Sequence, residues 1–184
     1  MKTCLRALAC VVLGCLLSAC PETTVNDDFG LKPVQVDADD WSGTWMPIDD
    51  DDTFHFAITD AAQGALRLIE PGKKDDKPLE FKLRHSSPDD DVKLWFALVR
   101  EGAEKEAKTQ AFLLRRPEKG VTLWWMIDDV AVETAIKAGQ LKGTTKRVKD
   151  DPHNHLDSDP ANYLKLLEPQ FWNWSEPSIL RRVK

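Results

Sequence analysis

The chain has 184 residues, with 25 Lys or Arg and 31 Asp or Glu, and a formal net charge of -6. Its first 19 residues hold the two cations Lys2 and Arg6 and no acid, so without them the net charge falls from -6 to -8. Such an acidic chain is a poor nucleic-acid partner, because phosphate neutralisation needs a basic face. The same charge argues against a domain lying flat on anionic lipid.

The N-terminal segment has the parts of an export signal. Lys2 and Arg6 give a positive start, and Leu5–Leu17 is otherwise apolar and too short to remain in a bilayer as a spanning helix. A conventional cut after Ala19 would place the bulky Leu17 where a small residue is needed. Simple secretion is therefore disfavoured.

Leu17-Ser18-Ala19-Cys20 resembles the lipobox of bacterial lipoproteins, in which a dedicated peptidase cuts before a lipidated cysteine. The resemblance implies that residues 1–19 are a cleaved signal peptide and that Cys20 is the lipid attachment site. Lipoproteins carry three acyl chains, and two or more chains anchor stably at about 0.8 kcal/mol per buried CH₂. Pro21 replaces the Asp that retains enterobacterial lipoproteins in the inner membrane. The resemblance thus implies an outer membrane location, facing the periplasm.

All four cysteines lie in this signal or at its end: Cys4, Cys10, Cys15 and Cys20. The remaining chain has none for a disulfide, so its stability must come from an ordinary core. About 165 residues follow the signal, enough for one domain. Residues 20–39 are polar, and we expect a lipidated N-terminus and flexible tether there. A single β-rich domain is expected over residues 40–184.

From Trp41 onward, apolar and polar residues alternate over short stretches separated by acidic, Pro-containing or Gly-containing turns. This period of two is typical of half-buried antiparallel strands. Short turns between them predict a meander. The predicted strands span 41–48, 53–59, 65–70, 79–84, 92–100, 108–116 and 121–127.

The period changes after residue 127. Asp128 and Asp129 can cap a helix that Gly139 ends, and Asp159-Pro160 begins a second helix. The remaining predictions are a strand-like return over 141–148, a loop over 149–159, the end of the second helix at Pro169, and a last strand, split by Pro177, that includes 178–182.

The predicted fold is mainly β: an antiparallel meander closing into a small up-and-down, lipocalin-like barrel, with two short helices near the C-terminus. Closure buries the apolar face and removes exposed edges, and a sandwich is the alternative. Gly43-Thr44-Trp45 resembles the Gly-x-Trp signature of lipocalins, in which the Trp packs at the barrel end beneath a late Arg. The resemblance implies this packing for Trp45 with Arg181, or with Arg182, and a cavity for a small apolar ligand.

Seven tryptophans stand beside one tyrosine, and exposed indoles make stacking platforms for sugars or peptides. Trp124 and Trp125 must point to opposite faces of a strand, so one can lie outside, and Trp172 and Trp174 share a face. We therefore predict a protein or glycan partner surface at Trp124, Trp172 and Trp174. The alternative is that these indoles pack in the core.

Chemistry-bearing motifs are absent from the sequence. His153-Asn154-His155 lies among acids but has no known zinc spacing, and the acidic runs lack the EF-hand pattern, so no metal site is predicted. No Gly-x-Ser-x-Gly, phosphate-loop or dinucleotide fingerprint occurs. We predict no catalytic residues, no cofactor and no enzyme.

These observations lead to one main hypothesis. The chain resembles the small envelope lipoproteins of Gram-negative bacteria, anchored to the membrane through lipid on Cys20, and we expect a non-enzymatic binding module. The alternative is a lipocalin-like carrier of a small hydrophobic ligand, whose cavity would be lined by residues such as Phe54, Phe81 and Phe96.

Overall fold

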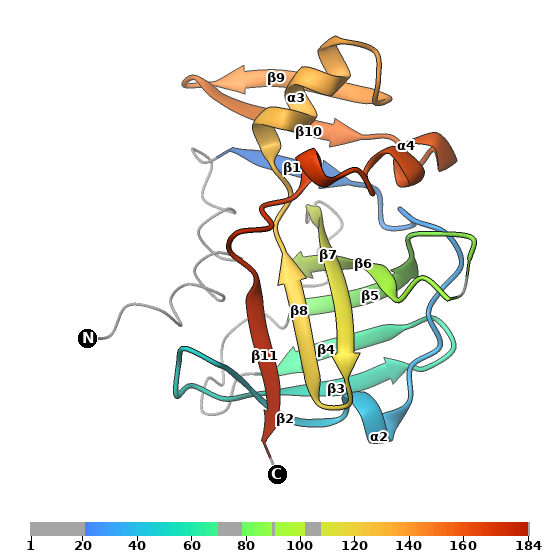
Figure 1. The fold of residues 1–184 in the computed structure, drawn as a ribbon, viewed down its shortest axis with the longest axis vertical. Coiled ribbons are helices and arrows are strands. Elements are labelled where there is room, and N and C mark those ends of the chain that lie inside the picture. Colours follow the sequence, from blue (N-terminus) through green and yellow to red (C-terminus); the bar gives the residue numbers. More distant parts are fainter. Residues whose placement is uncertain (1–20, 70–78, 90, 102–107, 184) are drawn as a thin grey trace.

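The computed structural model describes residues 21–69, 79–89, 91–101 and 108–183 (Figure 1). The predicted signal peptide 1–19 and Cys20 lie outside these residues. The described residues form strands β1 (Glu22–Val25), β2 (Gly43–Pro47), β3 (Phe54–Asp60), β4 (Ala65–Ile69), β5 (Leu79–His85), β6 (Leu94–Glu101), β7 (Thr109–Glu118), β8 (Val121–Trp125), β9 (Gly143–Val148), β10 (Asp151–Leu156) and β11 (Ser178–Val183). Helices are α2 (Ala38–Trp41), α3 (Asp129–Lys137), α4 (Pro160–Lys165) and the short 3-10 turn η1 (Pro169–Phe171).

Eight of these strands close into an antiparallel barrel. Strands β2 to β8 pair in chain order, and β11 pairs with both β8 and β2 to complete the ring. The predicted mainly β, lipocalin-like barrel is therefore confirmed. Alternation sets the inner face, as in β3, where Phe54 and Phe56 are buried and His55 between them is exposed.

The segment predicted as a tether is part of the fold. β1 pairs in parallel with β10 (Glu22 opposite His153) and antiparallel with β7 (Thr24 opposite Gln110). Further on, Phe29 is fully buried, and the Val34 N–H donates to the Leu83 carbonyl at 3.0 Å. The prediction of a flexible tether is wrong here because this polar segment pairs with strands far along the chain, which local composition does not show.

β10 was expected to be a loop and is a strand. It pairs with β9 across a turn at Lys149 and Asp150, whose φ angles are 50° and 72°. The two predicted short helices are present. The Asp128 carboxylate accepts the N–H groups of Val130 and Ala131 at the start of α3, and Asp159 accepts that of Ala161 at the start of α4.

Strands β6, β7 and β8 separate two hydrophobic cores. The first, called here the barrel core, fills the inside of the ring. The second, the outer core, lies between the outer face of these three strands and the N-terminal segment, β10, α3 and α4. Aromatic members of the barrel core are Trp41, Trp45, Phe54, Phe56, Phe81, Phe112 and Trp124; those of the outer core are Phe29, Phe96, Trp125, Tyr163, Phe171 and Trp172.

Candidate functional site

The three tryptophans of the predicted partner surface lie in different environments. Trp124 is 5% exposed in the barrel core and donates from Nε1 to Thr122 Oγ1 at 2.8 Å. Trp172 is 3% exposed in the outer core, where its ring stacks on Phe96. Only Trp174 is exposed, at 39%. The three-tryptophan surface is therefore wrong for Trp124 and Trp172, because β8 is buried on both faces and the alternation leads from one core into the other.

Trp45 is fully buried beneath α2, and its Nε1 donates to the Trp41 carbonyl at 2.9 Å. The predicted partner Arg181 is exposed on the outer wall of the barrel, so this assignment is wrong. Its neighbour Arg182 lies over Gly43, where an added Cβ would be 3.0 Å from Arg182 Nε. The Arg182 guanidinium also donates to the Asp39 carbonyl. The late arginine near the Gly-x-Trp segment is thus Arg182.

Aromatic rings occupy the inside of the barrel. Edge-to-face contacts run from Trp45 to Phe56 (5.9 Å between ring centroids), from Phe56 to Phe81 (5.5 Å) and from Phe81 to Trp124 (5.8 Å). These rings cross the space in which a lipocalin-type ligand would lie. Phe96, expected to line a cavity, instead belongs to the outer core.

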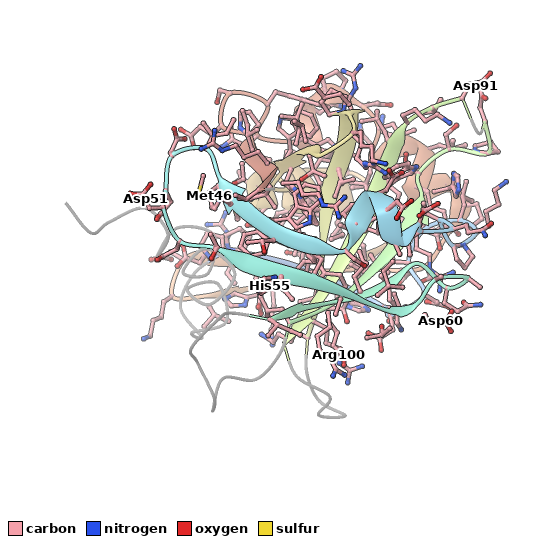
Figure 2. All side chains as sticks on the ribbon, turned by 90° about the horizontal axis from the view of Figure 1, so that it is seen from below. Met46, Asp51, His55, Asp60, Asp91 and Arg100 are labelled. Atoms are coloured by element: carbon pink, nitrogen blue, oxygen red, sulfur yellow. The ribbon has the colours of Figure 1, made fainter. Side chains whose placement is uncertain are left out.

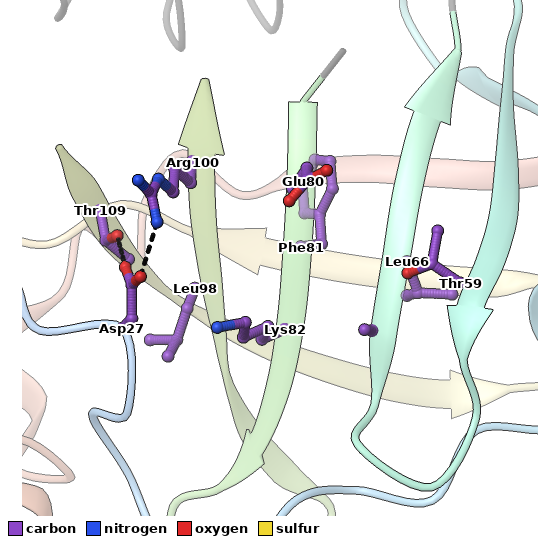
Figure 3. A pocket seen from close by; sticks show the side chains of 10 residues that line it. Asp27, Thr59, Leu66, Glu80, Phe81, Lys82, Leu98, Arg100 and Thr109 are labelled. Atoms are coloured by element: carbon purple, nitrogen blue, oxygen red, sulfur yellow. Dashed lines mark hydrogen bonds and ion pairs between the residues drawn. The ribbon is translucent and has the colours of Figure 1, made fainter. Parts of the chain in front are cut away.

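A small hollow of about 50 Å³ lies between the loop after β1 and strands β4 to β6 (Figure 3). At its rim the Arg100 guanidinium donates to the Asp27 carboxylate at 2.7 Å, and the Thr109 hydroxyl donates to the same carboxylate. A hollow of this size has room for only a few water molecules. It does not suit an organic substrate.

His153 and His155 lie on one face of β10. Both histidines were predicted to lie in a loop. His153 Nδ1 is 2.8 Å from Glu22 Oε1 of β1, and the Lys108 ammonium pairs with the same oxygen. Burial opposes ionisation of Glu22, but hydrogen bonds from Lys108 and His153 outweigh it and lower the pKa of Glu22 below its ordinary value. Within the described residues, no group of three or more His, Cys, Asp or Glu side chains is arranged to hold a metal ion.

Asp129, the first residue of α3, reaches the other face of β1. The Thr23 hydroxyl donates to Asp129 Oδ1 at 2.6 Å, and the Asn154 side-chain amide donates to the Asp129 carbonyl at 2.9 Å. Burial, together with the negative charges of Asp128 and Glu22, raises the pKa of Asp129 to about 6 despite the Thr23 hydrogen bond. The hollow beside it measures about 20 Å³. These contacts join β1, β10 and α3, and they leave no room for a substrate.

The large apolar side chains of Ile48 and Trp174 are exposed along the wall that includes β2 and β11. Ile48 is 51% exposed, and its N–H donates to the Ile179 carbonyl at 3.0 Å. Ile179 lies opposite Leu123, and the Trp174 ring is 5.0 Å from that of Trp125. We call this surface the Ile48–Trp174 face; it consists of the exposed Ile48 and Trp174 and the half-buried Met46, Leu123 and Ile179. Figure 2 shows Met46 on the outside of the barrel, beside the loop that carries Asp51.

Sequence reasoning singled out Trp174 in this face and missed Ile48. The alternation over 41–48 shows that two faces differ but not which of their apolar residues stay uncovered. No match to this chain is found among protein-family models, curated proteins or solved structures. In the part of the chain that the structure describes, no helix is long and apolar enough to cross a bilayer.

Proposed function

We propose that this protein is a bacterial lipoprotein held on the periplasmic side of an outer membrane through lipid on Cys20, and that its barrel is a non-enzymatic binding module. The lipobox-like Leu17-Ser18-Ala19-Cys20 carries this proposal, and the structure adds that β1 begins at Glu22, two residues after Cys20, and is paired with strands on both sides. Two residues span at most about 7 Å. An acylated Cys20 would therefore hold the folded body directly at the bilayer surface.

The contacts of β1 hold the first residues after Pro21 firmly in the fold. Glu22 pairs with Lys108 and His153, and Thr23 donates to Asp129, so the first two residues of the strand are tied to the residue before β7, to β10 and to α3. A lipid on Cys20 would then fix how the domain faces the membrane. A flexible tether would leave that orientation free.

The filled barrel core supports a binding module in preference to a carrier. A pocket for a small organic ligand measures about 300–1,000 Å³, whereas the rings of Phe56, Phe81 and Trp124 pack against one another inside this barrel. Barrel closure is the feature that favours the carrier, which remains the alternative proposal. The partner, protein or glycan, would then meet the outer surface, where Trp174 is the exposed indole of the predicted site.

The anchor is tested by Cys20→Ser in the full chain, expressed in a Gram-negative host. We expect loss of palmitate labelling and accumulation of a longer precursor that keeps residues 1–19, because the dedicated peptidase cuts before a lipidated cysteine. Cys15→Ser, which changes a cysteine five residues earlier, is the matched control and should keep both the label and the mature length. Unchanged labelling in Cys20→Ser would refute the anchor.

The carrier alternative is tested with a fluorescent fatty acid titrated into the same purified protein. The binding-module proposal predicts no saturable binding inside the barrel. Stoichiometric binding that quenches the buried tryptophans would instead establish the carrier.

A further inference from the structure

We propose that the Ile48–Trp174 face is a membrane-contact surface that lies against a zwitterionic phospholipid interface when Cys20 is acylated. This inference rests on the proposed lipid anchor, and it assigns Trp174 to a lipid contact in place of the protein or glycan contact considered above. The argument uses three observations: where the chain leaves the fold, which side chains are uncovered there, and which charges surround them.

The first observation is position. Pro21 and Glu22 line the small hollow beside Met126 and Ile127, the residues that follow β8. The Asn173 N–H donates to the Met126 carbonyl at 3.0 Å, so Trp174 is one residue from this group. In Figure 1 the start of β1, the segment leading into β11 and the loop between β2 and β3 all lie on the left. In this view the start of β1 and the segments that carry the apolar face lie towards the same side, with β1 nearer the top and the β2–β3 loop nearer the bottom.

The second observation is the chemistry of the uncovered side chains. Trp174 exposes part of its ring, while its Nε1 donates to the Pro169 carbonyl at 2.6 Å. Indoles favour the interface between water and hydrocarbon, where an apolar ring can be buried and polar groups remain hydrated. Ile48 adds a half-exposed aliphatic side chain on the same wall. Apolar area removed from water stabilises contact at roughly 25 cal/mol per Å².

Because the anchor would hold the protein at the membrane, a small apolar surface is enough to contact the bilayer. A tethered surface meets its partner at a high effective concentration, so weak contacts that would fail between separate molecules are occupied. At a reach of two residues from Cys20 to Glu22, the face would be held beside the bilayer. The contact needs no deep insertion and no independent affinity for lipid.

The third observation is the charge around the face. The acidic run Asp49 to Asp52 directly follows Ile48, and anionic headgroups would repel it. Arg181 lies opposite Met46 on the same wall and is exposed, within reach of a lipid phosphate. A zwitterionic headgroup carries a phosphate that Arg181 can contact and an ammonium that the aspartates can contact. The lipid we infer therefore carries no net charge.

The test uses single cysteines carrying an environment-sensitive fluorophore, since Cys20 is the only cysteine after residue 15. Ile48→Cys probes the face. Leu164→Cys is the matched control: Leu164 is 56% exposed and belongs to α4, a helix that lies on the right in Figure 1. Because both side chains are exposed, neither change disturbs a core. Each acylated full-length variant is reconstituted in phosphatidylethanolamine–phosphatidylcholine vesicles that contain a spin-labelled quencher lipid.

We expect the fluorophore at position 48 to shift to the blue and to be quenched, the fluorophore at 164 to remain water-like, and phosphatidylglycerol to weaken the quenching at 48. Water-like emission at both positions in a sample that mass spectrometry shows to be acylated overturns this inference and leaves the anchor standing. A sample without acyl chains overturns both proposals. Shielding at 48 only after an envelope protein or glycan fraction is added also overturns it, in favour of a soluble partner.

Discussion

The barrel core and the outer core lie on opposite faces of β6, β7 and β8, and they are assembled in different ways. The barrel core comes from strands that follow one another in the chain and pair as hairpins, with β11 closing the ring. The outer core brings Val25 and Phe29 from the start of the chain against Tyr163 and Trp172 from near its end. The barrel core is thus built mainly from neighbouring segments of the chain, β11 apart, and the outer core is not.

The difference also extends to polarity. The barrel core is mainly apolar, with the buried Thr122 hydroxyl hydrogen-bonded to Trp124. The outer region, in contrast, contains the Glu22–His153 pair and the hydrogen bond between Thr23 and Asp129. Glu133 on α3 pairs with Arg147 of β9 at 2.7 Å, and hydrogen bonds from Arg147 and Lys137 lower the pKa of Glu133 to about 2. The barrel is therefore a scaffold held by packing. The outer region also contains these hydrogen bonds and ion pairs, which we call the polar joint. Those of Glu22 and Thr23 fix the start of β1 next to the predicted anchor.

The largest expected effect is that of Trp45→Ala in the barrel core. Trp45 is fully buried against Trp41 and Phe56, and a Trp to Ala change in a core costs about 3–5 kcal/mol of unfolding free energy. Since the outer core packs on the outside of the same strands, both regions should unfold together in urea, followed by circular dichroism. Trp174→Ala, on the surface, is the control. Outer-region structure that survived barrel unfolding would show that the two cores are independent.

Phe29→Ala tests the reverse direction. Phe29 is fully buried between Phe96 (5.5 Å) and Tyr163 (4.8 Å), and its truncation should cost about 3–4 kcal/mol. We expect hydrogen exchange, measured by mass spectrometry, to rise in β1, β10 and α3 while β3 to β5 stay protected. The reason is that the barrel ring closes without the outer region. Equal acceleration in β3 to β5 would contradict this asymmetry.

Gly64→Ala acts where the N-terminal segment crosses the barrel. Gly64 has φ +65°, and an added Cβ would lie 2.6 Å from the Val34 carbonyl oxygen and 2.7 Å from that of Leu83. We expect Gly64→Ala to lower the free energy of unfolding by about 2–3 kcal/mol, because the backbone is strained and the N-terminal segment at Val34 is displaced. Gly139→Ala is the matched control, because its φ is +69° and nothing lies within 4 Å of the added atom. If the two variants lowered the unfolding temperature equally, backbone strain alone would explain the effect, and the contact of the N-terminal segment with Gly64 would not contribute.

The same division explains what could be predicted from sequence. The barrel strands follow from alternation and local turns, and the starts of α3 and α4 follow from the capping residues Asp128 and Asp159. β1 and β10 were missed because both are polar; they pair with each other across about 130 residues, as with Glu22 and His153, and the β9–β10 hairpin lacks a clear apolar alternation. No local pattern encodes such a pairing.

For the site, one signal was available in the sequence. The run from Leu94 to Val99 is continuously apolar, which is typical of a strand buried on both faces. It indicates a second layer outside the barrel, and a second layer would have placed Trp125 and Trp172 in a core. The exposure of Ile48 could not be predicted from such a pattern. It depends on which strands of the barrel the outer segments cover, and the sequence does not show this.

The smallest effect, and the only stabilising one, is expected from Asp129→Asn in the polar joint. Burial raises the pKa of Asp129 from 3.8 to about 6, so the folded state binds this proton more tightly than the unfolded state. The ionised carboxylate therefore destabilises the fold above pH 6, and this cost disappears as the pH falls towards 4. Asparagine does not ionise but can still accept the Thr23 hydroxyl.

The variant should therefore be more stable than the wild type by about 1–2 kcal/mol at pH 7.5 and nearly equal at pH 4. Thermal unfolding at both pH values measures this difference. Asp128→Asn, one residue earlier, is the control, since Asn replaces Asp well at a helix N-cap and little change is expected at either pH. A gain that did not depend on pH would mean that the charge of Asp129 is not what destabilises the joint. The outer region would then no longer differ from the barrel core in the pH dependence of its stability.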